Sequence, residues 1–241
     1  MNTIYFLDFD GVICDSILEC FISSYIGYYH IYRNEKPEAM DIERYKKFIA
    51  LRPFIRRGAD YLLLHEILDA GVRCASQREF DQILKDSGQE LSDLFHEYFY
   101  QVRDDLLEKQ REYWLSLNKL YKPLIPHMSG WAASPRVYIL STKKAEFIRE
   151  ILLFNGINWP LERIIYSSNR SKNEIICQTV SENNASDAFF IDDQIDHFKG
   201  IDDPRISTAL AVWGYIQQEW LHQTRVPAYQ INDLIRTLTL K

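Results

Sequence analysis

Short apolar runs separated by amphipathic segments form the pattern of the chain's second half. The helical spacing is clear where Phe147, Ile151 and Phe154 share one face of a segment that ends at Asn155-Gly156, a pair typical of helix C-termini. Strands that alternate with helices in this way predict right-handed crossovers and a doubly wound parallel sheet. The runs that predict buried strands are residues 3–8, 136–141, 187–192 and 205–212, with a shorter candidate at 163–166.

The segment 15–125 interrupts this alternation. Apolar residues recur at helical spacing over 17–32, and a long amphipathic stretch covers 91–120. Strand patterns are absent between them, so this part is predicted to be entirely helical. The predicted fold class is therefore α/β, with a Rossmann-like doubly wound core made of 1–14 plus 126–241 and a helical domain inserted after the first strand.

Composition and charge argue against several classes of protein, among them nucleic-acid-binding, secreted and membrane-spanning proteins. The 241 residues carry 28 Lys and Arg against 34 Asp and Glu, and this net charge of −6 does not favour a nucleic-acid surface. The four cysteines lack metal-ligand spacing and suit a reducing compartment. The N-terminus has no signal-peptide pattern, and no run approaches the ~18 to 20 apolar residues of a membrane span. A cytoplasmic protein without membrane attachment is predicted, and its oligomeric state is left open.

Two aspartates close the first predicted strand. Asp8 and Asp10 stand two positions apart, so both side chains point to one side. Like charges so close raise one pKa unless a cation or a reaction partner compensates. The next question is therefore what lies at the other strand ends, because ligands of open α/β sheets bind outside the carboxyl ends of the strands.

Side chains of complementary chemistry follow three other predicted strands. Carboxylates, hydroxyls and an ammonium group on one edge of a sheet suit a hard cation bound beside a phosphate. The residues concerned are Ser141 and Thr142 at the end of 136–141, Lys172 after 163–166, and Asp192 and Asp193 at the end of 187–192. Ser171 followed by Glu174 is a capping-box pattern, which predicts a helix that begins at Lys172.

With these motifs in order, the chain resembles the haloacid dehalogenase-like (HAD) superfamily, and in particular its C1-capped members of the phosphoglycolate phosphatase and β-phosphoglucomutase type. "DFDGV" is similar to the first motif of that family, "ILSTK" to the second and "FIDDQID" to the acidic fourth, while Lys172 fits the third. The helical insert stands where this family places its C1-type cap. The resemblance covers the whole chain.

The resemblance implies a Mg²⁺-dependent phosphatase that hydrolyses a small phosphorylated metabolite through an aspartyl-phosphate. Asp8 is the expected nucleophile, and Asp10 is the expected acid and base for the leaving group and the attacking water. The Mg²⁺ ligands it implies are Asp8, the Asp10 carbonyl and Asp193, with Asp192 in a more peripheral role. The remaining residues expected to contact or neutralise the phosphate are Gly11, Ser141, Thr142 and Lys172.

Several of these residues have a second interpretation. Lys172 is followed by Asn173 where many relatives have proline, so Lys143 or Lys144 is the second candidate for the ammonium group. The remaining interpretations are structural: a turn cap for Asp8 and Asp10, helix N-caps for Ser141 and Thr142, a helix cap or the orientation of a neighbouring side chain for Asp196, and a solvated helix position for Lys172.

The insert adds one candidate for substrate selection. Arg52, Arg56 and Arg57 directly precede Gly58 and a new helical pattern. The resemblance implies that an element at this place selects substrate, and arginines there suit an anionic group through bidentate hydrogen bonds. The competing interpretation is that these arginines are solvated or paired with nearby acids.

Other activities on the same scaffold compete with the phosphatase. The resemblance gives a dehalogenase no use for Asp10, which argues against that reaction. A phosphomutase, a phosphonate hydrolase with a cap lysine such as Lys46, Lys47 or Lys119, and a catalytically inactive binding module stay open. The substrate also stays open among sugar phosphates, phosphoglycolate and nucleotides.

Overall fold

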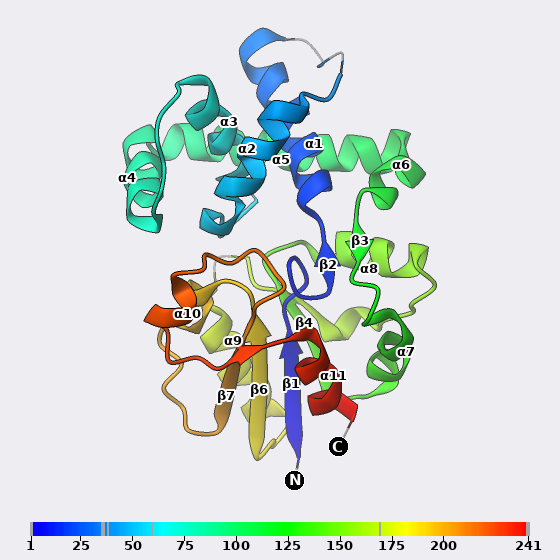
Figure 1. Cartoon of the computed structure of the whole chain (residues 1–241). Coiled ribbons are helices and arrows are strands. Elements are labelled where there is room, and N and C mark those ends of the chain that lie inside the picture. The colour runs from blue at the N-terminus through cyan, green and yellow to red at the C-terminus, as the bar shows by residue number, and fades with distance from the viewer. Residues whose placement is uncertain (1, 35–36, 38, 59, 169, 240–241) are drawn as a thin grey trace. The chain divides into compact units, whose positions relative to one another are not determined.

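The chain forms two compact units in a computed structural model that describes residues 2–34, 37, 39–58, 60–168 and 170–239 (Figure 1). One unit combines Met1–Asp15 with Lys119–Lys241, and the other is Ser16–Asn118. The second boundary thus lies before Lys119 and not after residue 125. The physical reason is a two-stranded antiparallel pairing at the base of the insert, because β3 (Lys119–Leu120) pairs with β2 (Cys14–Asp15).

The first unit is built on a six-stranded sheet in which every pairing is parallel. In order across the sheet, its strands are β5 (Ile164–Tyr166), β4 (Val137–Ser141), β1 (Thr3–Leu7), β6 (Asp187–Asp192), β7 (Ile206–Ala211) and β8 (Ala228–Tyr229). The chain winds outward from β1 in both directions, which confirms the doubly wound sheet (Figure 1). The apolar pattern does not predict β8, because two residues are too few to show a period.

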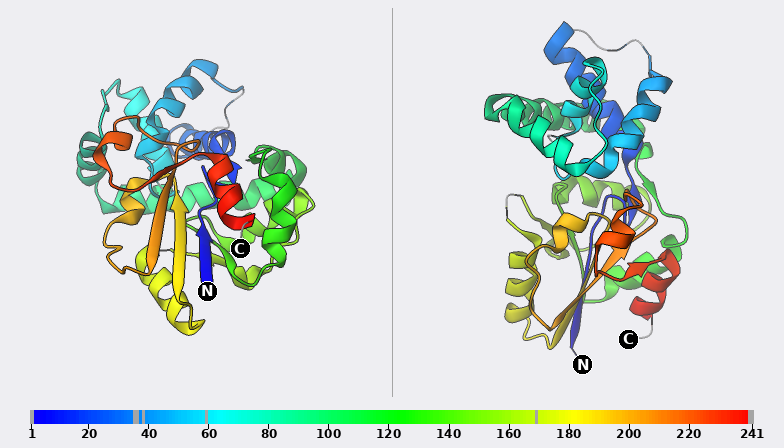
Figure 2. Two further views of the ribbon diagram at one scale, coloured as in Figure 1. Left: turned by 60° about the horizontal axis from the view of Figure 1, so that its bottom comes forward. Right: turned by 60° about the vertical axis from the view of Figure 1, so that its left-hand side comes forward.

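Alternate residues of β1 pack on opposite faces of the sheet. Ile4 and Phe6 join Ile175 and Ile176 of α9 (Lys172–Glu182) in one buried apolar cluster. Tyr5 lies on the other face, where it lines a cavity together with residues of α7 (Ile125–Ala133) and α11 (Ile231–Thr239). Helices therefore cover both faces of the sheet (Figure 2). The other described helical segments of this unit are α8 (Ala145–Phe154), η2 (Leu161–Arg163), η3 (Ile195–Phe198) and α10 (Trp220–Gln223).

Two helix ends follow signals that the sequence predicts. The Ser171 hydroxyl accepts a hydrogen bond from the Glu174 N–H, and the Glu174 carboxylate accepts one from the Ser171 N–H, which is a capping box. After α8, Gly156 has a φ of 76°, in the left-handed region that favours glycine. The capping box makes Lys172 the first residue of α9, close to the carboxyl ends of the strands.

Every regular element among the described residues of the second unit (16–34, 37, 39–58 and 60–118) is a helix, as predicted. The amphipathic stretch 91–120 is not one helix, because Gln110 leaves the helical conformation with a φ of −141° and Leu120 belongs to β3. No described helix of the chain is both long and apolar enough to cross a lipid bilayer. The helices are α1 (Ile17–Arg33), α2 (Ile42–Leu51), η1 (Arg52–Phe54), α3 (Asp60–Asp69), α4 (Gln77–Ser87), α5 (Gln89–Lys109) and α6 (Arg111–Ser116).

A buried ion pair joins three helices of this unit. The Arg103 guanidinium of α5 donates to both carboxylate oxygens of Glu19 in α1, at 2.8 and 2.6 Å. Glu19 also accepts hydrogen bonds from the Ser23 hydroxyl at 2.7 Å and from the Trp114 indole of α6 at 3.1 Å. Side-chain exposure is 3% for Arg103 and 0% for Glu19, so the two charged groups are not hydrated by bulk water. A buried carboxylate satisfied in this way holds α1, α5 and α6 in one register.

A buried histidine joins α1, α2 and α3. His65 Nδ1 accepts a hydrogen bond from Arg44 Nε at 3.0 Å, so the neutral ring carries its proton on Nε2, 2.9 Å from the Ser24 hydroxyl. That hydroxyl donates its own proton to the Cys20 carbonyl at 2.6 Å. A second ring proton therefore has no acceptor among the described residues. Burial, reinforced by the Arg44 charge, lowers the pKa of His65 well below its ordinary value.

We expect this histidine to make the helical unit less stable in acid. Below about pH 6.5, His65 binds a proton in the unfolded chain but stays neutral in the folded chain. The free energy of unfolding therefore falls by up to about 1.4 kcal/mol for each unit by which the pH is lowered. Urea unfolding followed by circular dichroism between pH 7.5 and 5 measures this slope. His65→Gln should reduce this slope by about one proton, because it removes the group that titrates only in the unfolded chain. Equal slopes in the wild type and in His65→Gln would contradict the account.

Candidate active site

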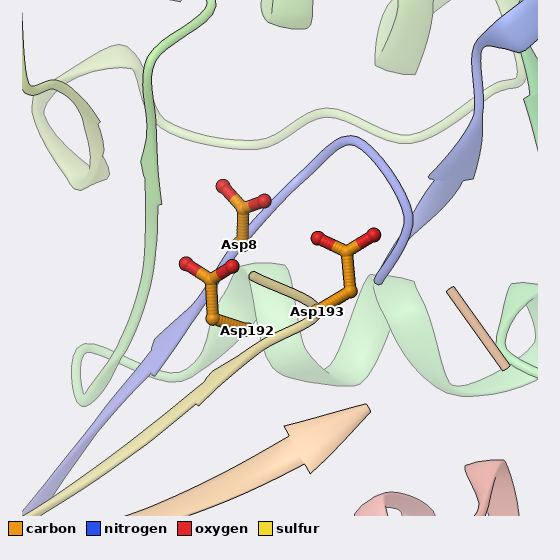
Figure 3. A group of neighbouring side chains, drawn as sticks. All are labelled: Asp8, Asp192 and Asp193. Atoms are coloured by element: carbon orange, nitrogen blue, oxygen red, sulfur yellow. The ribbon is translucent and has the colours of Figure 1, made fainter. Parts of the chain in front are cut away.

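Three carboxylates meet where β1 and β6 end side by side. The Asp8 N–H donates to the Ile191 carbonyl at 3.0 Å, which places Asp8 beside the end of β6. Figure 3 shows the side chains of Asp8, Asp192 and Asp193 extending from these two strand ends toward a common space. Each offers a carboxylate oxygen within 4.8 Å of the others, and all three residues are buried. The sequence-predicted acidic cluster is therefore assembled in the structure.

Lys172 lies between two of these carboxylates. Its ammonium is 2.8 Å from Asp8 Oδ1 and 2.6 Å from Asp192 Oδ2, and its side chain is only 2% exposed. The interpretation of Lys172 as a solvated helix lysine is therefore wrong. Asp192 is further held by His197 Nδ1 at 2.8 Å and by the Gln194 N–H at 2.9 Å. Lys172 thus reaches the strand ends although no proline follows it.

Burial and charge act in opposite directions on these groups. Burial raises the pKa of Asp8 above its ordinary value, with the Lys172 charge opposing this shift and the Asp192 charge adding to it. For Asp192 burial alone would raise the pKa, but His197 and Lys172 hold it below its ordinary value. Burial would lower the pKa of Lys172, and the two carboxylates outweigh it, so the pKa is raised and the ammonium stays charged.

Asp10 has a lysine of its own. Lys143 Nζ lies 2.8 Å from Asp10 Oδ1, with side-chain exposures of 1% and 15%. Lys144, the other second candidate for the ammonium group, instead places its Nζ 5.7 Å from the centre of the Phe147 ring. Lys172 therefore pairs with Asp8 and Asp192, and Lys143 pairs with Asp10. Sequence reasoning named Lys143 only as a substitute for Lys172, and its partner was missed.

Ser141 and Thr142 lie at the end of β4, the neighbour of β1 in the sheet. Ser141 is buried and its hydroxyl oxygen accepts a hydrogen bond from the Lys143 N–H at 3.3 Å, while Thr142 is half-buried. The N-cap of α8 is Lys144, so the interpretation of Ser141 and Thr142 as N-caps is wrong. Ser141 therefore lies at the same sheet edge as Asp8 because β4 ends there beside β1, and its hydroxyl does not cap a helix.

Asp196 and the three arginines are engaged elsewhere. Asp196 pairs with Lys199 at 2.6 Å, and the N-cap of η3 is Gln194, so the helix-cap interpretation of Asp196 is wrong. Within the helical unit, Arg56 donates to both carboxylate oxygens of Asp81, at 2.6 and 3.1 Å. Arg57 Nη2 lies 3.8 Å from Asp60 Oδ1. Arg52 is buried, and its guanidinium lies over the Tyr61 ring. Pairing with acids thus describes Arg56 and Arg57 in this structure, and their contact with substrate stays a prediction.

Residues from outside the motifs complete the site. His197 follows Asp192 by five positions, and the backbone N–H of Tyr215 donates to Asp193 Oδ2 at 2.7 Å. The histidine inside "DDQIDH" is a weak signal that could have suggested a partner for Asp192. For Tyr215, which follows β7, the sequence carries no comparable signal.

The charge balance of this site fits a divalent cation. Asp8, Asp192 and Asp193 bring three carboxylates to one buried place, and Lys172 sets one ammonium group against two of them. Negative charge thus exceeds positive charge among these four residues where water is scarce, a situation that a hard cation with oxygen ligands relieves. The donor set, made only of carboxylate oxygens, is of the kind that Mg²⁺ prefers.

The same arrangement of elements occurs in solved structures. No family model and no curated protein matches the chain. A haloacid dehalogenase-like family hydrolase from Streptococcus pneumoniae is similar, with a TM-score of 0.58 and 15% identity over 99% of both chains. A predicted phosphatase from Clostridium acetobutylicum gives 0.58 and 14% over 100% of both. A predicted phosphoglycolate phosphatase from Haemophilus somnus gives 0.61 and 13% over 98% of this chain and 97% of that one.

The chain therefore has the fold of the haloacid dehalogenase-like hydrolases. This confirms the fold class that the apolar pattern predicts: a doubly wound α/β core with a helical unit inserted after the first strand. At these identities the likeness concerns the fold, so the reaction must be argued from the site itself.

Proposed function

We propose that this protein is a Mg²⁺-dependent phosphatase that hydrolyses a small phosphate monoester through an aspartyl-phosphate at Asp8. The observation that carries the proposal is the buried group of Asp8, Asp192 and Asp193 around the Lys172 ammonium at the carboxyl edge of the sheet. The similar fold of hydrolases and of predicted phosphatases supports the same reaction class.

The first half-reaction transfers the phosphoryl group to the protein. A carboxylate oxygen of Asp8 attacks phosphorus, the bond from phosphorus to the substrate oxygen breaks, and Asp10 gives its proton to the leaving alkoxide. The buried Lys172, 2.8 Å from Asp8, reduces the repulsion between carboxylate and phosphate dianion. Ser141, on the neighbouring strand, is proposed to donate its hydroxyl hydrogen bond to a phosphoryl oxygen, with Gly11 and Thr142 as further contacts.

The second half-reaction restores the enzyme. Asp10, now a carboxylate, accepts a proton from water as that water attacks phosphorus, and the bond from phosphorus to Asp8 breaks to release inorganic phosphate. Lys143, 2.8 Å from Asp10, stabilises the carboxylate form of this residue between the two steps. Asp10 thus acts first as an acid and then as a base, while Asp8 carries the phosphoryl group. The reaction therefore needs two aspartates that are two positions apart and point to the same side.

Carboxylates would supply most of the protein's ligands to the cation. Asp8 and Asp193 are the proposed carboxylate ligands, with the Asp10 carbonyl as a third protein ligand. Asp192, bonded to Lys172 and His197, contributes charge from the periphery. Bound Mg²⁺ supplies charge neutralisation to the phosphoryl oxygens of the transition state. For localisation and partners we propose a cytoplasmic enzyme of phosphorylated metabolites, without a nucleic-acid or membrane partner.

Metal removal should abolish the activity. Purified protein is assayed with p-nitrophenyl phosphate and a panel of sugar phosphates, phosphoglycolate and nucleotides, with Mg²⁺ and with EDTA. We expect EDTA to lower phosphate release by more than about tenfold and Mg²⁺ to restore it, because the dianion and the carboxylates otherwise repel one another. Activity that survives exhaustive chelation would contradict the metal requirement, and no release from any compound would favour the inactive binding module.

The phosphonate hydrolase and the phosphomutase can each be distinguished from the phosphatase. Lys46, Lys47 and Lys119 are exposed, and Lys46 pairs with Glu43 at 2.7 Å, so none has the burial that makes a lysine a good Schiff-base former. This weighs against a phosphonate hydrolase. A phosphomutase would require a bisphosphate activator in the same assay and would release little free phosphate.

A further inference from the structure

The loop that follows β7, residues 212–216, holds one of the acidic side chains of the site. The backbone N–H of Tyr215 donates a hydrogen bond to Asp193 Oδ2 at 2.7 Å. Asp193 itself is buried, with 3% of its surface exposed. A short bond from a main-chain donor to a buried carboxylate fixes the direction of that carboxylate, because the donor cannot rotate away as a side chain would.

The same loop leaves no room for a side chain at Gly214. A Cβ atom at this position would lie 2.5 Å from Asp193 Cβ, 2.7 Å from Asp193 Oδ2 and 2.6 Å from the Gly11 carbonyl oxygen. The backbone of Gly214 is not in the left-handed region, so glycine is required there for space and not for conformation. Gly11, with a φ of 86°, also approaches the Asp193 carboxylate closely. The carboxylate is thus packed against two glycines.

Two side chains tie this loop to the segment that follows the first motif. The Trp213 indole donates to the Val12 carbonyl at 3.0 Å, and the Tyr215 hydroxyl donates to Asp15 Oδ1 at 2.7 Å. Residues on both sides of Gly214 are therefore anchored to 11–15. A side chain added at Gly214 could not be accommodated by a retreat of the loop, so the displacement would fall on Asp193.

We infer that the loop 212–216 is the positioning element of the metal site, with Gly214 and Tyr215 setting the orientation in which Asp193 meets the cation. This inference rests on the proposed metal site and deepens it by naming residues outside the four motifs. Hydrogen-bonded support of a ligating carboxylate commonly contributes a factor of about 10 to 100 in metal affinity. Gly214 acts through Asp193 and has no contact with substrate in this scheme.

The test compares two Gly→Ala substitutions in the same unit. Gly214→Ala places a methyl group against Asp193, whereas Gly130→Ala, in α7, places it where nothing lies within 4 Å. Mg²⁺ binding is measured by isothermal titration calorimetry, and thermal unfolding is followed with and without Mg²⁺. We expect Gly214→Ala to bind Mg²⁺ about 10- to 100-fold more weakly and to lose most of the Mg²⁺-induced rise in Tm, with Gly130→Ala matching the wild type.

A second variant keeps the inference testable if Gly214→Ala does not fold. Trp213→Phe preserves an aromatic ring but removes the hydrogen bond to the Val12 carbonyl, so the loop loosens without a clash. We expect Mg²⁺ to bind about two- to tenfold more weakly, the loss expected for one hydrogen bond. Wild-type affinity in a folded Gly214→Ala protein would overturn the inference. If that variant does not fold, wild-type affinity in Trp213→Phe would overturn it, and so would a wild-type protein that binds no Mg²⁺.

Binding and turnover are measured separately, so this inference and the proposed function can fail independently. Mg²⁺ that binds the wild type tightly and Gly214→Ala weakly supports the positioning role even if no phosphate ester is hydrolysed. That result would refute the phosphatase and keep the loop's role. Conversely, a Mg²⁺-dependent phosphatase whose metal affinity is indifferent to both substitutions would keep the proposed function and refute the inference.

Discussion

Asp8→Asn is expected to lower phosphate release by at least about 1,000-fold, because an amide oxygen cannot replace the carboxylate as a nucleophile. The substitution preserves shape, and the new amide carbonyl oxygen can still accept the hydrogen bond that Lys172 donates to Asp8. The fold should therefore persist, with circular dichroism spectra and Tm close to those of the wild type. Steady-state kcat with the best substrate of the panel, at saturating Mg²⁺, measures the loss.

A matched substitution on the neighbouring strand serves as the control. Asp187 begins β6, at the opposite end of this strand from Asp192, and it accepts a hydrogen bond from the Ser186 hydroxyl. Asp187→Asn changes the same functional group without reaching the site, so kcat should stay close to that of the wild type. Asp8→Asn with more than about a tenth of the wild-type kcat would contradict the assignment of the nucleophile.

Arg103→Met should destabilise the helical unit by about 3–5 kcal/mol, the cost of leaving a buried charge without its partner. The carboxylate of Glu19 has no exposed surface, and its bonds to Ser23 and Trp114 do not supply a compensating charge. Urea unfolding followed by tryptophan fluorescence measures the change, since Trp114 reports directly on this place.

Two further variants separate the buried charge from loss of packing. Glu19→Leu combined with Arg103→Met removes both charges, and it should recover most of the stability lost in Arg103→Met. Lys109→Met breaks the exposed pair with Asp105 on the same helix, and we expect it to cost no more than about 1 kcal/mol. An Arg103→Met protein as stable as Lys109→Met would show that the pair carries no stability.

The core and its acidic edge are predictable from the sequence for a clear reason. Buried parallel strands read as continuous apolar runs, and the residue types that follow them stand out against those runs. Asp8, Asp192 and Asp193 are therefore visible as strand-end carboxylates, and the parallel pairing of β1 with β6 brings them together. The capping box at Ser171 fixes where α9 begins, which is why the position of Lys172 could be anticipated.

Other parts of the site depend on pairings between distant segments. The partner of Asp10 is Lys143, one of two adjacent lysines after β4. The backbone conformation after β4 determines which of the two side chains is buried beside Asp10. Arg56 meets Asp81 across 25 positions, so a charge count near Arg56 could not reveal its partner. Gly214 is a glycine because of Asp193, a neighbour in space only. Such contacts have no periodic signature.

Short elements escape prediction for a related reason. The paired strands β2 and β3 and the edge strand β8 have two residues each, too few to show a repeating strand pattern. The boundary of the helical unit depends on the pairing of β2 with β3, so the predicted boundary after residue 125 lies beyond the observed one before Lys119. The break between α5 and α6 at Gln110 is likewise a local change of backbone within a continuous amphipathic pattern.

Direct capture of the covalent intermediate tests whether Asp8 is the nucleophile. The protein is quenched in denaturant during turnover of the best substrate with Mg²⁺, reduced with borohydride to trap any acyl phosphate, and digested for peptide mass spectrometry. The account predicts that the peptide containing Asp8 carries the reduced side chain, and that this product is absent without substrate and absent in Asp8→Asn. Rapid phosphate release with Asp8 unmodified, or with the label on another residue, would contradict it.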